Sequence, residues 1–553
     1  MISAFERRWV LWFAGVVMTI TTLPYLLGYA AQGMDYYFTG FIFGVEDGNS
    51  YIAKMLSGTF SAWLFRSPYT ASPQQGMLIY LPYILLGKMA APPGLHEQLV
   101  ALYHLYRIVA GFLVIIATYH FLAFFLKDTW VRRFGLLLII LGGGLGWLLV
   151  ISGSNYWWGS LPLDFYSPET FCFLSLYGLP HLALARALLL GTLLAYLKGV
   201  TSILYPDSEL VLSRTLMLRS ALNVSILWLF TGLAQPLDAV VIGIVIMWHQ
   251  VGLAAWIILR HTQGSSTDLS SYWQLVKFVI LSGILPGLFV MYNLWTSFHD
   301  PFVATWMGQN VLKSPHPLHY LLAYGLILPY AYLGGRRLLH HQPFKGWLLV
   351  SWIIILPLLV YLPVNLQRRL SDGVWVALVT LAMLTLEGLS SRNVPRRDWK
   401  RFLSTTPLFL LFPTTLFLIA GGIKAALWVK EPHFRPYDEV AVFQYIQAKS
   451  DPGVVVLASY KTGNTLPAWA PVRVLIGHGP ESAFLPELQA KVAAFFSETT
   501  PDQQRIDLIH QYEVGYVFYG PTERALGKWN PERAGYLEPV YQSSAYVLFR
   551  VLP

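Results

Sequence analysis

Long apolar segments alternate with short polar ones along most of the chain. A helix that crosses a bilayer needs about 20 mostly apolar residues, and about a dozen segments have this length or nearly so. The expected spans lie near residues 9–30, 77–92, 98–126, 134–152, 178–199, 220–235, 238–259, 275–297, 317–335, 346–363, 373–390 and 405–429. The pattern therefore predicts an α-helical polytopic membrane protein with about 11–13 transmembrane helices.

The pattern changes after Trp428. Short apolar runs with the period of strands, such as 453–459 and 514–520, alternate there with amphipathic segments of helical period. We expect residues 1–430 to form the transmembrane module, with an outer juxtamembrane loop at 31–76. Residues 431–553 are expected to form an extracytoplasmic α/β domain. Two glycine-rich loops of this domain, 459–469 and 476–482, follow strands, and we expect them to bind an acceptor glycan or to pack over a cavity.

Composition agrees with a membrane protein. The chain of 553 residues is 55% hydrophobic and only 12% charged, whereas a soluble domain carries about 25% charged residues. The net charge of +9 sits in short loops rather than in a basic tract mixed with aromatic residues, which argues against a nucleic-acid partner. A single cysteine, Cys172, excludes an intramolecular disulfide.

The basic loops predict how the chain crosses the membrane, because positive residues stay on the cytoplasmic side. Arg7 and Arg8 precede the first span, which favours a cytoplasmic N-terminus. The other basic loops are Lys127–Arg133, Arg214–Arg219, Arg260–His261, Gly335–Lys345 and Arg392–Arg401. They predict a multi-pass protein of the plasma (inner) membrane whose C-terminal domain is outside.

One conflict remains in this topology. Segments 77–92 and 98–126 cannot both cross the membrane if the N-terminus and Lys127–Arg133 share the cytoplasmic side. Segment 77–92 is shorter than a usual span. Either it is a short re-entrant or tilted element, or the basic loop departs from the rule.

Two adjacent acids, Glu46 and Asp47, follow the first span. The apolar positions after them fit one face of a helix that rests on the membrane surface: Tyr51, Ile52, Met55, Leu56 and Phe60. Asp47 has two compatible interpretations. It or Asn49 is the N-cap of this helix, or Asp47 faces a cavity and takes a proton from an attacking hydroxyl.

An acid after the first span, with a tyrosine four residues later on a juxtamembrane helix, resembles the GT-C glycosyltransferases, in particular the aminoarabinose-transferase and protein mannosyltransferase group. The family's Asp-Glu-x-x-Tyr pattern matches Asp47-Gly48-Asn49-Ser50-Tyr51, with Gly48 in place of the second acid and Glu46 standing before the aspartate. The resemblance implies sugar transfer from a polyprenyl-phosphate donor to a hydroxyl of a glycan, lipid or protein, at the outer face of the membrane. Asp47 would be the general base, with Glu46 beside it. It leaves a divalent cation possible, with its ligands unassigned.

Further polar residues are candidates for substrate binding, since ionisable groups are costly near a membrane span. Tyr51 and Lys54 lie on the motif helix. Arg368 and Arg369 are on a predicted outer loop, where they would bind the lipid phosphate, contact an anionic headgroup or pair with Asp372.

A second group of candidates lies around the span at 178–199. Glu169 precedes this span as a cap or a second carboxylate. His181 and Arg186 lie within it as cavity-lining groups, with a structural histidine as the alternative for His181. Pro180 is expected to kink the helix.

Four residues near the loop 298–316 are candidate metal ligands, although their spacing matches no strong zinc signature: His299, Asp300, His316 and His319. Two other functions compete with the enzyme. A lipid or glycan transporter would usually show repeated halves, and none is visible. A non-catalytic membrane scaffold with the same fold is the second alternative.

Overall fold

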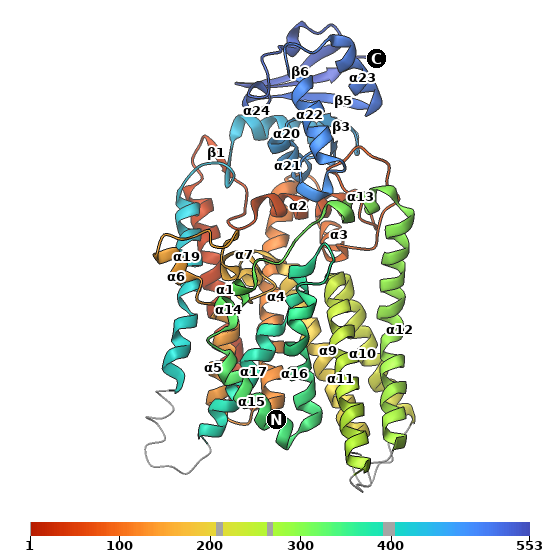
Figure 1. Cartoon of the computed structure of the whole chain (residues 1–553). Coiled ribbons are helices and arrows are strands. Elements are labelled where there is room, and N and C mark those ends of the chain that lie inside the picture. The colour runs from red at the N-terminus through yellow and green to blue at the C-terminus, as the bar shows by residue number, and fades with distance from the viewer. Residues whose placement is uncertain (1, 206–213, 263–268, 391–403) are drawn as a thin grey trace. The chain divides into compact units, whose positions relative to one another are not determined.

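The computed structural model describes residues 2–205, 214–262, 269–390 and 404–553 (Figure 1). The chain divides into two compact units. Unit 1 comprises Met1–Thr22, Tyr106–Tyr292 and Leu312–Gly421, and unit 2 comprises Leu23–Leu105, Asn293–Val311 and Gly422–Pro553. Four of the five divisions fall inside helices, and the fifth, at Val311/Leu312, follows α13 (Pro301–Gln309). The four helices are α1 (Ala4–Ala31), α4 (Leu95–Phe125), α12 (Leu269–His299) and α19 (Pro413–Leu427).

Unit 1 is helical. Its further elements are α5 (Thr129–Leu141), α6 (Trp147–Ile151), α7 (Leu163–Tyr166), α8 (Phe173–Gly178), α9 (Pro180–Leu204), α10 (Arg214–Ala234), α11 (Pro236–Thr262), α14 (Pro317–Tyr324), α15 (Leu328–His341), α16 (Pro343–Leu359), η1 (Gln367–Ser371), α17 (Val374–Ser390) and η2 (Thr406–Leu411). Helices α9, α10 and α11 run side by side, and α15, α16 and α17 form a second packed set (Figure 1). Pro180 is the first residue of α9, so it begins this helix and does not kink it.

Among the described residues, eight helices are long and apolar enough to cross a membrane. They are Ala4–Ala31, Leu95–Phe125, Pro180–Leu204, Thr215–Ala234, Pro236–Leu259, Ser270–His299, Gln367–Leu389 and Thr406–Leu427. Shorter helices replace three of the expected spans: α5 and α6 at 134–152, α14 and the start of α15 at 317–335, and α16 at 346–363. The protein is therefore a multi-pass helical membrane protein.

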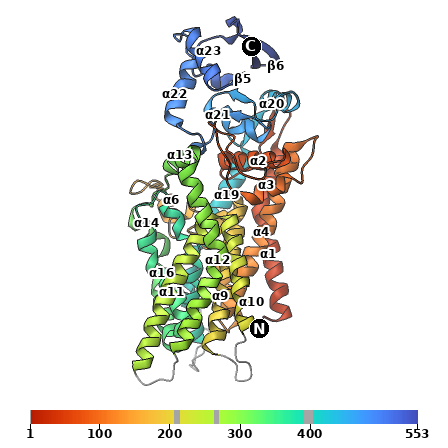
Figure 2. The ribbon, with the colours of Figure 1, turned by 90° about the vertical axis from the view of Figure 1, so that its right-hand side faces the viewer.

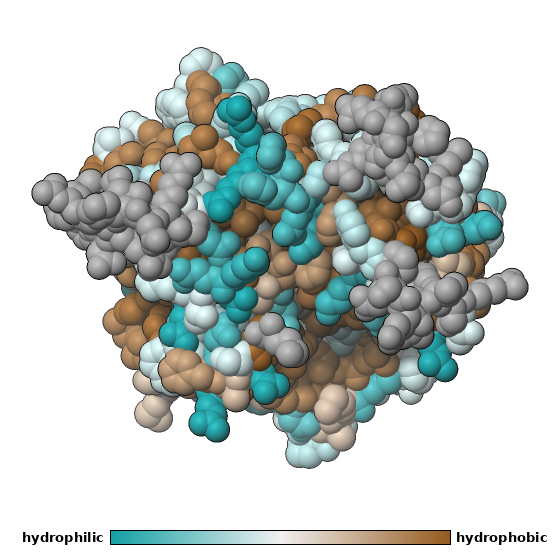
Figure 3. All heavy atoms as spheres, turned by 90° about the horizontal axis from the view of Figure 1, so that it is seen from below, coloured by the Kyte–Doolittle hydropathy of each residue, from teal (hydrophilic) through white to brown (hydrophobic). Residues whose placement is uncertain are grey.

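The structure resolves the conflict over the second predicted span. In place of 77–92 there is only α3 (Leu81–Gly87), seven residues or about 10 Å of helix, whereas a bilayer core is about 30 Å thick. The Arg132 guanidinium lies 2.8 Å from the Glu6 carboxylate, so the start of α1 and the basic segment Lys127–Arg133 share one end of unit 1. Polar residues gather at this end (Figure 3).

The other basic segments differ from the loops that we expected. Arg214–Arg219 begins α10, Arg260–His261 ends α11, and Gly335–Lys345 belongs largely to α15 and α16. The segment Arg392–Arg401 lies outside the described residues. Helices therefore carry much of the positive charge that the sequence places in loops.

Unit 2 combines short helices with two sheets. Its elements are β1 (Tyr36–Phe38), α2 (Val45–Thr59), α3, α13 (Pro301–Gln309), β2 (Phe434–Pro436), α20 (Tyr437–Lys449), β3 (Val455–Leu457), α21 (Tyr460–Thr465), η3 (Leu466–Ala468), β4 (Arg473–Val474), η4 (Gly479–Glu481), α22 (Leu485–Phe495), α23 (Asp502–Gln511), β5 (Val514–Tyr519), α24 (Pro521–Arg524), η5 (Pro531–Arg533), β6 (Leu537–Ser543) and β7 (Tyr546–Val551). β1 pairs antiparallel with β2, so the segment after α1 joins the C-terminal region in one small sheet.

The larger sheet of unit 2 has the strand order β4-β3-β5-β7-β6. β3 is parallel to β4 and β5, whereas β7 is antiparallel to β5 and β6. Carboxyl ends of parallel strands share one edge of a sheet, and ligands of open α/β sheets bind beyond that edge. The chain leaves this edge after β3 into α21 and after β4 into the loop 475–482. Both segments carry polar residues of the site described below.

Helices α2 and α3 pack side by side through glycines (Figure 2). A Cβ on Gly58 would overlap the carbonyl oxygen of Ile84, and one on Gly87 would overlap the carbonyl oxygen of Met55. The obstructing atoms belong to the backbone, which cannot rotate away as a side chain can. The close approach of the two helices thus depends on these two glycines.

We predict that Gly58→Ala lowers the free energy of unfolding by about 1–3 kcal/mol, because the added methyl group overpacks a backbone contact. Gly15→Ala is the matched control, since a Cβ there meets nothing within 4 Å, and alanine raises helix propensity. Thermal unfolding of the purified variants in detergent measures both effects. An unfolding temperature for Gly58→Ala equal to that of Gly15→Ala would contradict this packing argument.

Candidate functional site

Helix α2 begins three residues earlier than a cap at Asp47 would require, and five earlier than a cap at Asn49. Its N-cap is Gly44, in the left-handed region at φ 60°, and no side chain caps the helix. The prediction that Asp47 or Asn49 is the N-cap is therefore wrong. Glu46 and Asp47 occupy the first turn instead, where the helix dipole favours negative charge.

Gly48 fills the position where the family pattern has its second acid. A Cβ at this position would overlap the ring of Phe41, which is 2% exposed. The position therefore has no room for a carboxylate side chain in this protein. Packing against Phe41 gives a physical reason for the departure from the motif.

One face of α2 is polar and carries Asp47, Ser50 and Lys54, at the i, i+3, i+7 spacing of a helical stripe. Lys54 is 1% exposed, and its ammonium lies 2.7 Å from Oε1 of Glu481, which is also buried. The ammonium also donates to the Ser50 hydroxyl. Burial lowers the pKa of Lys54, and the Glu481 carboxylate opposes this shift. The predicted substrate ligand Lys54 is thus committed to a buried ion pair.

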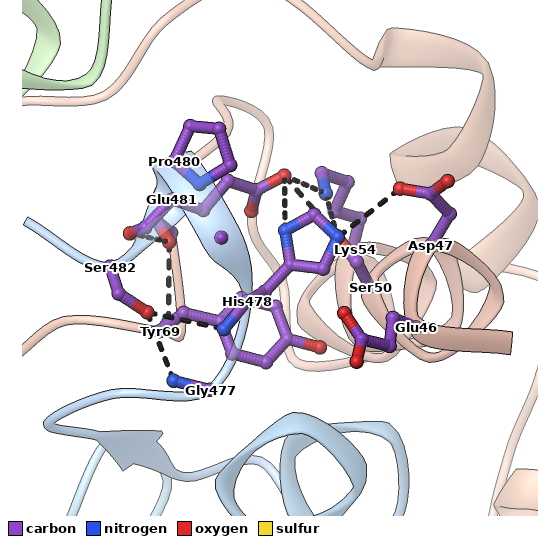
Figure 4. A network of polar contacts seen from close by, with 12 residues as sticks. Glu46, Asp47, Ser50, Lys54, Tyr69, Gly477, His478, Pro480, Glu481 and Ser482 are labelled. Carbon is purple, nitrogen blue, oxygen red and sulfur yellow. Dashed lines mark hydrogen bonds and ion pairs between the residues drawn. The ribbon is translucent and has the colours of Figure 1, made fainter. Parts of the chain in front are cut away.

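His478 lies between the two ends of this polar face (Figure 4). Its Nε2 is 3.2 Å from Oδ1 of Asp47, and its Nδ1 is 3.7 Å from Oε1 of Glu481. The Asp47 side chain is 55% exposed and the His478 side chain 13%. Asp47 is therefore an accessible carboxylate, and one of its two oxygens accepts a hydrogen bond from the His478 imidazole.

Helix α21 meets α2 on the side of Glu46. The Asn49 amide donates to Oδ1 of Asn464 at 2.8 Å, and the Tyr460 hydroxyl donates to the Glu46 carboxylate at 3.4 Å. Burial raises the pKa of Tyr460, which keeps its hydroxyl a donor. Glu46 and Asp47 are thus adjacent in sequence but bonded to different segments of the C-terminal region.

Tyr51 of the motif packs in an aromatic stack. Its ring lies 4.6 Å from that of Tyr83 at an interplanar angle of 9°, and 6.2 Å from that of Tyr103. Its predicted role in substrate binding stays a prediction. The stack anchors α2 to α3 and α4. It thereby also fixes the first turn of α2, which carries Asp47.

Unit 1 contains a second cluster of charged residues. Arg186 is buried and donates to Asp372 at 2.7 Å. It also donates to backbone carbonyl groups of Pro168, Glu169 and Phe171. Arg186 therefore shapes the segment that carries Glu169, and its contact with a substrate stays a prediction.

Arg368 and Arg369 lie close to Glu169, but their Nε–H groups form no hydrogen bond with its carboxylate. The Nε atoms of the two arginines lie 4.0 and 3.5 Å from the two Glu169 oxygens. Both Nε atoms are buried and without a hydrogen-bond partner among the described residues. Unlike Arg186, these two guanidinium groups have donors left over. The alternative pairing of these arginines with Asp372 is not what the structure contains, because Asp372 pairs with Arg186.

The remaining candidates are buried in unit 1. His181 is 7% exposed in the first turn of α9, and Asp238, in the first turn of α11, is 2% exposed. Gln235 alone separates α10 from α11, so the two helices are joined by a tight connection.

No group of three or more His, Cys, Asp or Glu side chains that could hold a metal ion occurs in the part of the chain that the structure describes. Asp300 caps α13 and also accepts from the Gln75 backbone at 2.9 Å. His316 caps α14, and His319 contacts the carbonyl group of Trp157. His299 stacks on Trp295.

Sequence reasoning placed the loop 476–482 near function but did not single out His478 or Glu481. Both are separated from α2 by more than 400 residues, so no local pattern pairs them with it. The available signals were the unexplained polar stripe Asp47, Ser50 and Lys54, and a histidine and a glutamate in a glycine-rich loop after a strand.

Comparison with solved structures identifies the fold. The apo oligosaccharyltransferase of Archaeoglobus fulgidus matches with a TM-score of 0.56 at 13% identity, over 94% of this chain and 70% of that one. Apo ArnT from Cupriavidus metallidurans matches at 0.50 and 11% identity, over 97% of both chains. Arabinofuranosyltransferase AftD from Mycobacteria matches at 0.51 and 12% identity, over the whole of this chain and 42% of that one. No protein-family model matches the chain, and no curated protein is similar to it in sequence.

We predict that Lys54→Met lowers the free energy of unfolding by about 3–5 kcal/mol, because it leaves the Glu481 carboxylate buried without its cation. The double variant Lys54→Met/Glu481→Leu should recover most of this loss, since no unpaired charge then remains. Thermal unfolding in detergent measures all three proteins. Arg550→Gln, which removes the exposed pair with Glu538, should unfold as the wild type does. A double variant no more stable than Lys54→Met would contradict the ion-pair argument.

Proposed function

We propose that this chain, whose fold is that of the GT-C glycosyltransferases, transfers a sugar from a polyprenyl-phosphate donor to an acceptor hydroxyl with inversion. The observation that carries the proposal is the accessible Asp47 carboxylate at the start of α2, which matches the aspartate of the family's Asp-Glu-x-x-Tyr pattern. The donor class comes from the family resemblance, and ArnT from Cupriavidus metallidurans has also been solved with undecaprenyl phosphate bound.

The proposed reaction needs one base and one anion site. The acceptor oxygen forms a bond to C1 of the sugar, and the bond between C1 and the phosphate oxygen breaks with its electron pair leaving on the phosphate. The acceptor's proton passes to the Asp47 carboxylate. General-base catalysis of this kind contributes about 10²–10⁴-fold to a rate. Charge-assisted hydrogen bonds stabilise the leaving phosphate.

Asp47 fits the role of the base better than Glu46 does. It is more than half exposed, and the hydrogen bond from His478 favours its ionised form. Glu46 is held by the Tyr460 hydroxyl. The two acids therefore make a matched pair for substitution, one residue apart and in the same helical turn.

Arg368 and Arg369 fit the role of the phosphate ligands. Their Nε–H groups are buried and have no acceptor within the described part of the chain, and a buried donor without an acceptor costs about 1–3 kcal/mol. A phosphate would supply oxygens to both. Glu169 presents its carboxylate to the same two groups, so it would compete with the phosphate for them.

The proposed orientation follows from the charges at the ends of unit 1. Arg7, Arg8, Arg132 and Arg133 lie at the end where the chain begins, and we assign this end to the cytoplasm by the positive-inside rule. Residues 431–553 would then be outside, as would transfer. The acceptor would be a glycan, a lipid or a protein at that face.

We predict that Asp47→Asn lowers kcat for sugar transfer by at least about 100-fold, because the amide cannot accept the acceptor's proton. Glu46→Gln should keep most of the activity. The measurement is release of undecaprenyl phosphate by purified protein, from a panel of undecaprenyl-phosphate sugars with lipid or glycan acceptors. Loss of activity in Glu46→Gln with Asp47→Asn active would assign the base to Glu46. No transfer from any donor would overturn the proposed function.

We predict opposite effects of two substitutions on binding of undecaprenyl phosphate. Arg369→Gln should weaken binding about tenfold, because one charge-assisted contact is lost. Glu169→Gln should tighten it by a similar factor, since the competing carboxylate is neutralised. Calorimetric titration in detergent measures both, with undecaprenol as the control that lacks the phosphate. Weaker binding by Glu169→Gln would mean that Glu169 positions the arginines instead of competing with the phosphate.

A further inference from the structure

The loop that follows β4 is fixed on the polar face of α2 at two points. Glu481 bonds Lys54, and His478 bonds Asp47 two turns earlier on the same helix (Figure 4). Within the loop, the Ser482 hydroxyl accepts from the backbone N–H groups of Gly477 and His478. The loop is therefore a rigid turn whose histidine is aimed at the proposed base.

Close packing of glycines brings the loop to this position. A Cβ on Gly477 would overlap the backbone of Gly463 in α21, and one on Gly463 would overlap the carbonyl oxygen of Ile476. The Gly479 N–H donates to the Tyr460 hydroxyl at 2.8 Å. The two segments that follow β3 and β4, α21 and the loop 475–482, thus pack against each other at the place where both contact α2.

The imidazole of His478 faces groups of both charges. Asp47 and Lys54 come from α2, Glu481 from its own turn, and the Tyr69 ring lies 5.3 Å from the imidazole centroid. Glu46, next to Asp47 on α2, accepts a hydrogen bond from Tyr460. Nε2 carries the hydrogen bond to Asp47, while Nδ1 is buried without a hydrogen-bond partner among the described residues.

We infer that His478 is a positioning residue for the reaction: its Nε2–H holds one oxygen of Asp47 and thereby fixes the carboxylate in its ionised, proton-accepting form. The inference rests on the proposed function and deepens it, because it assigns the C-terminal region a part in the transfer step. The loop does not need this bond in order to dock, since the buried Lys54–Glu481 pair already joins it to α2. The bond from His478 to an exposed carboxylate therefore acts on the carboxylate.

Two substitutions separate this role from a structural one. Glutamine in His478→Gln keeps an N–H donor near the place of Nε2 but does not titrate, whereas leucine in His478→Leu has similar bulk and no donor. Both variants keep the Lys54–Glu481 pair, so their thermal unfolding should match that of the wild type. The first measurement is the pH dependence of kcat for release of undecaprenyl phosphate from an undecaprenyl-phosphate sugar.

His478→Leu should lower kcat by about tenfold or more and leave KM for the donor unchanged. Its acid limb should move to higher pH by about 0.5–1 unit, because the ionised form of Asp47 loses a hydrogen bond. His478→Gln should stay within about threefold of the wild type, with the acid limb in place. Equal losses in the two variants, or a wild-type profile in His478→Leu, would overturn the inference.

A second measurement is independent of catalysis. Carbodiimide modifies protonated carboxyl groups, so mass spectrometry of Asp47 labelled at a series of pH values reports its ionisation directly. Labelling of Asp47 should extend to higher pH in His478→Leu and not in His478→Gln, with Glu46 unchanged as the internal control. This result in a protein without transferase activity would support the hydrogen bond and overturn only the proposed function. Unchanged Asp47 labelling in an active protein would overturn the inference alone.

Discussion

A lysine ammonium and a glutamate carboxylate that meet out of reach of water tie the start of this chain to its end. Lys54 and Glu481 are 427 residues apart, and their charged atoms lie 2.7 Å apart. A buried charge is costly unless its partner is present in good geometry, so the loop after β4 has one register on α2. Because Asp47 lies two turns before Lys54, that register also places His478 against Asp47. The contact between His478 and the proposed base thus depends on an ion pair that takes no part in the reaction.

The charged clusters of the two units differ in how completely their groups are paired. Lys54 and Arg186 are bonded to carboxylates in good geometry, and they organise the segments around them. Arg368 and Arg369 only approach Glu169, and the described residues offer their Nε–H groups no acceptor within hydrogen-bond distance. Groups that are fully paired shape a site, whereas groups with donors left over are available to a ligand. The same distinction separates buried Lys54 from exposed Asp47, although the sequence presents both as candidate ligands.

The sequence was informative where a pattern is local or where lipid imposes it. Long apolar segments predicted a helical membrane protein, and the stripe of Tyr51, Ile52 and Met55 predicted α2. The short apolar segment at 77–92 was ambiguous, because hydropathy does not distinguish a membrane span from a short packed helix such as α3. The N-cap was misplaced because Gly44 begins α2 through its left-handed backbone conformation, and the sequence there carries no capping side chain.

His478 and Glu481 were missed because their partners are more than 400 residues away. The absence of a second acid at Gly48 is explained by the Phe41 ring, which covers this position in the folded structure.

The central claim is that Asp47, held by His478, receives the acceptor's proton. A structure of the protein with a phosphonate analogue of a polyprenyl-phosphate sugar tests it most directly. Sugar density is expected within hydrogen-bond distance of the Asp47 carboxylate, with His478 still bonded to Oδ1. A sugar bound away from Asp47, or an Asp47 carboxylate turned away from both sugar and His478, would contradict it.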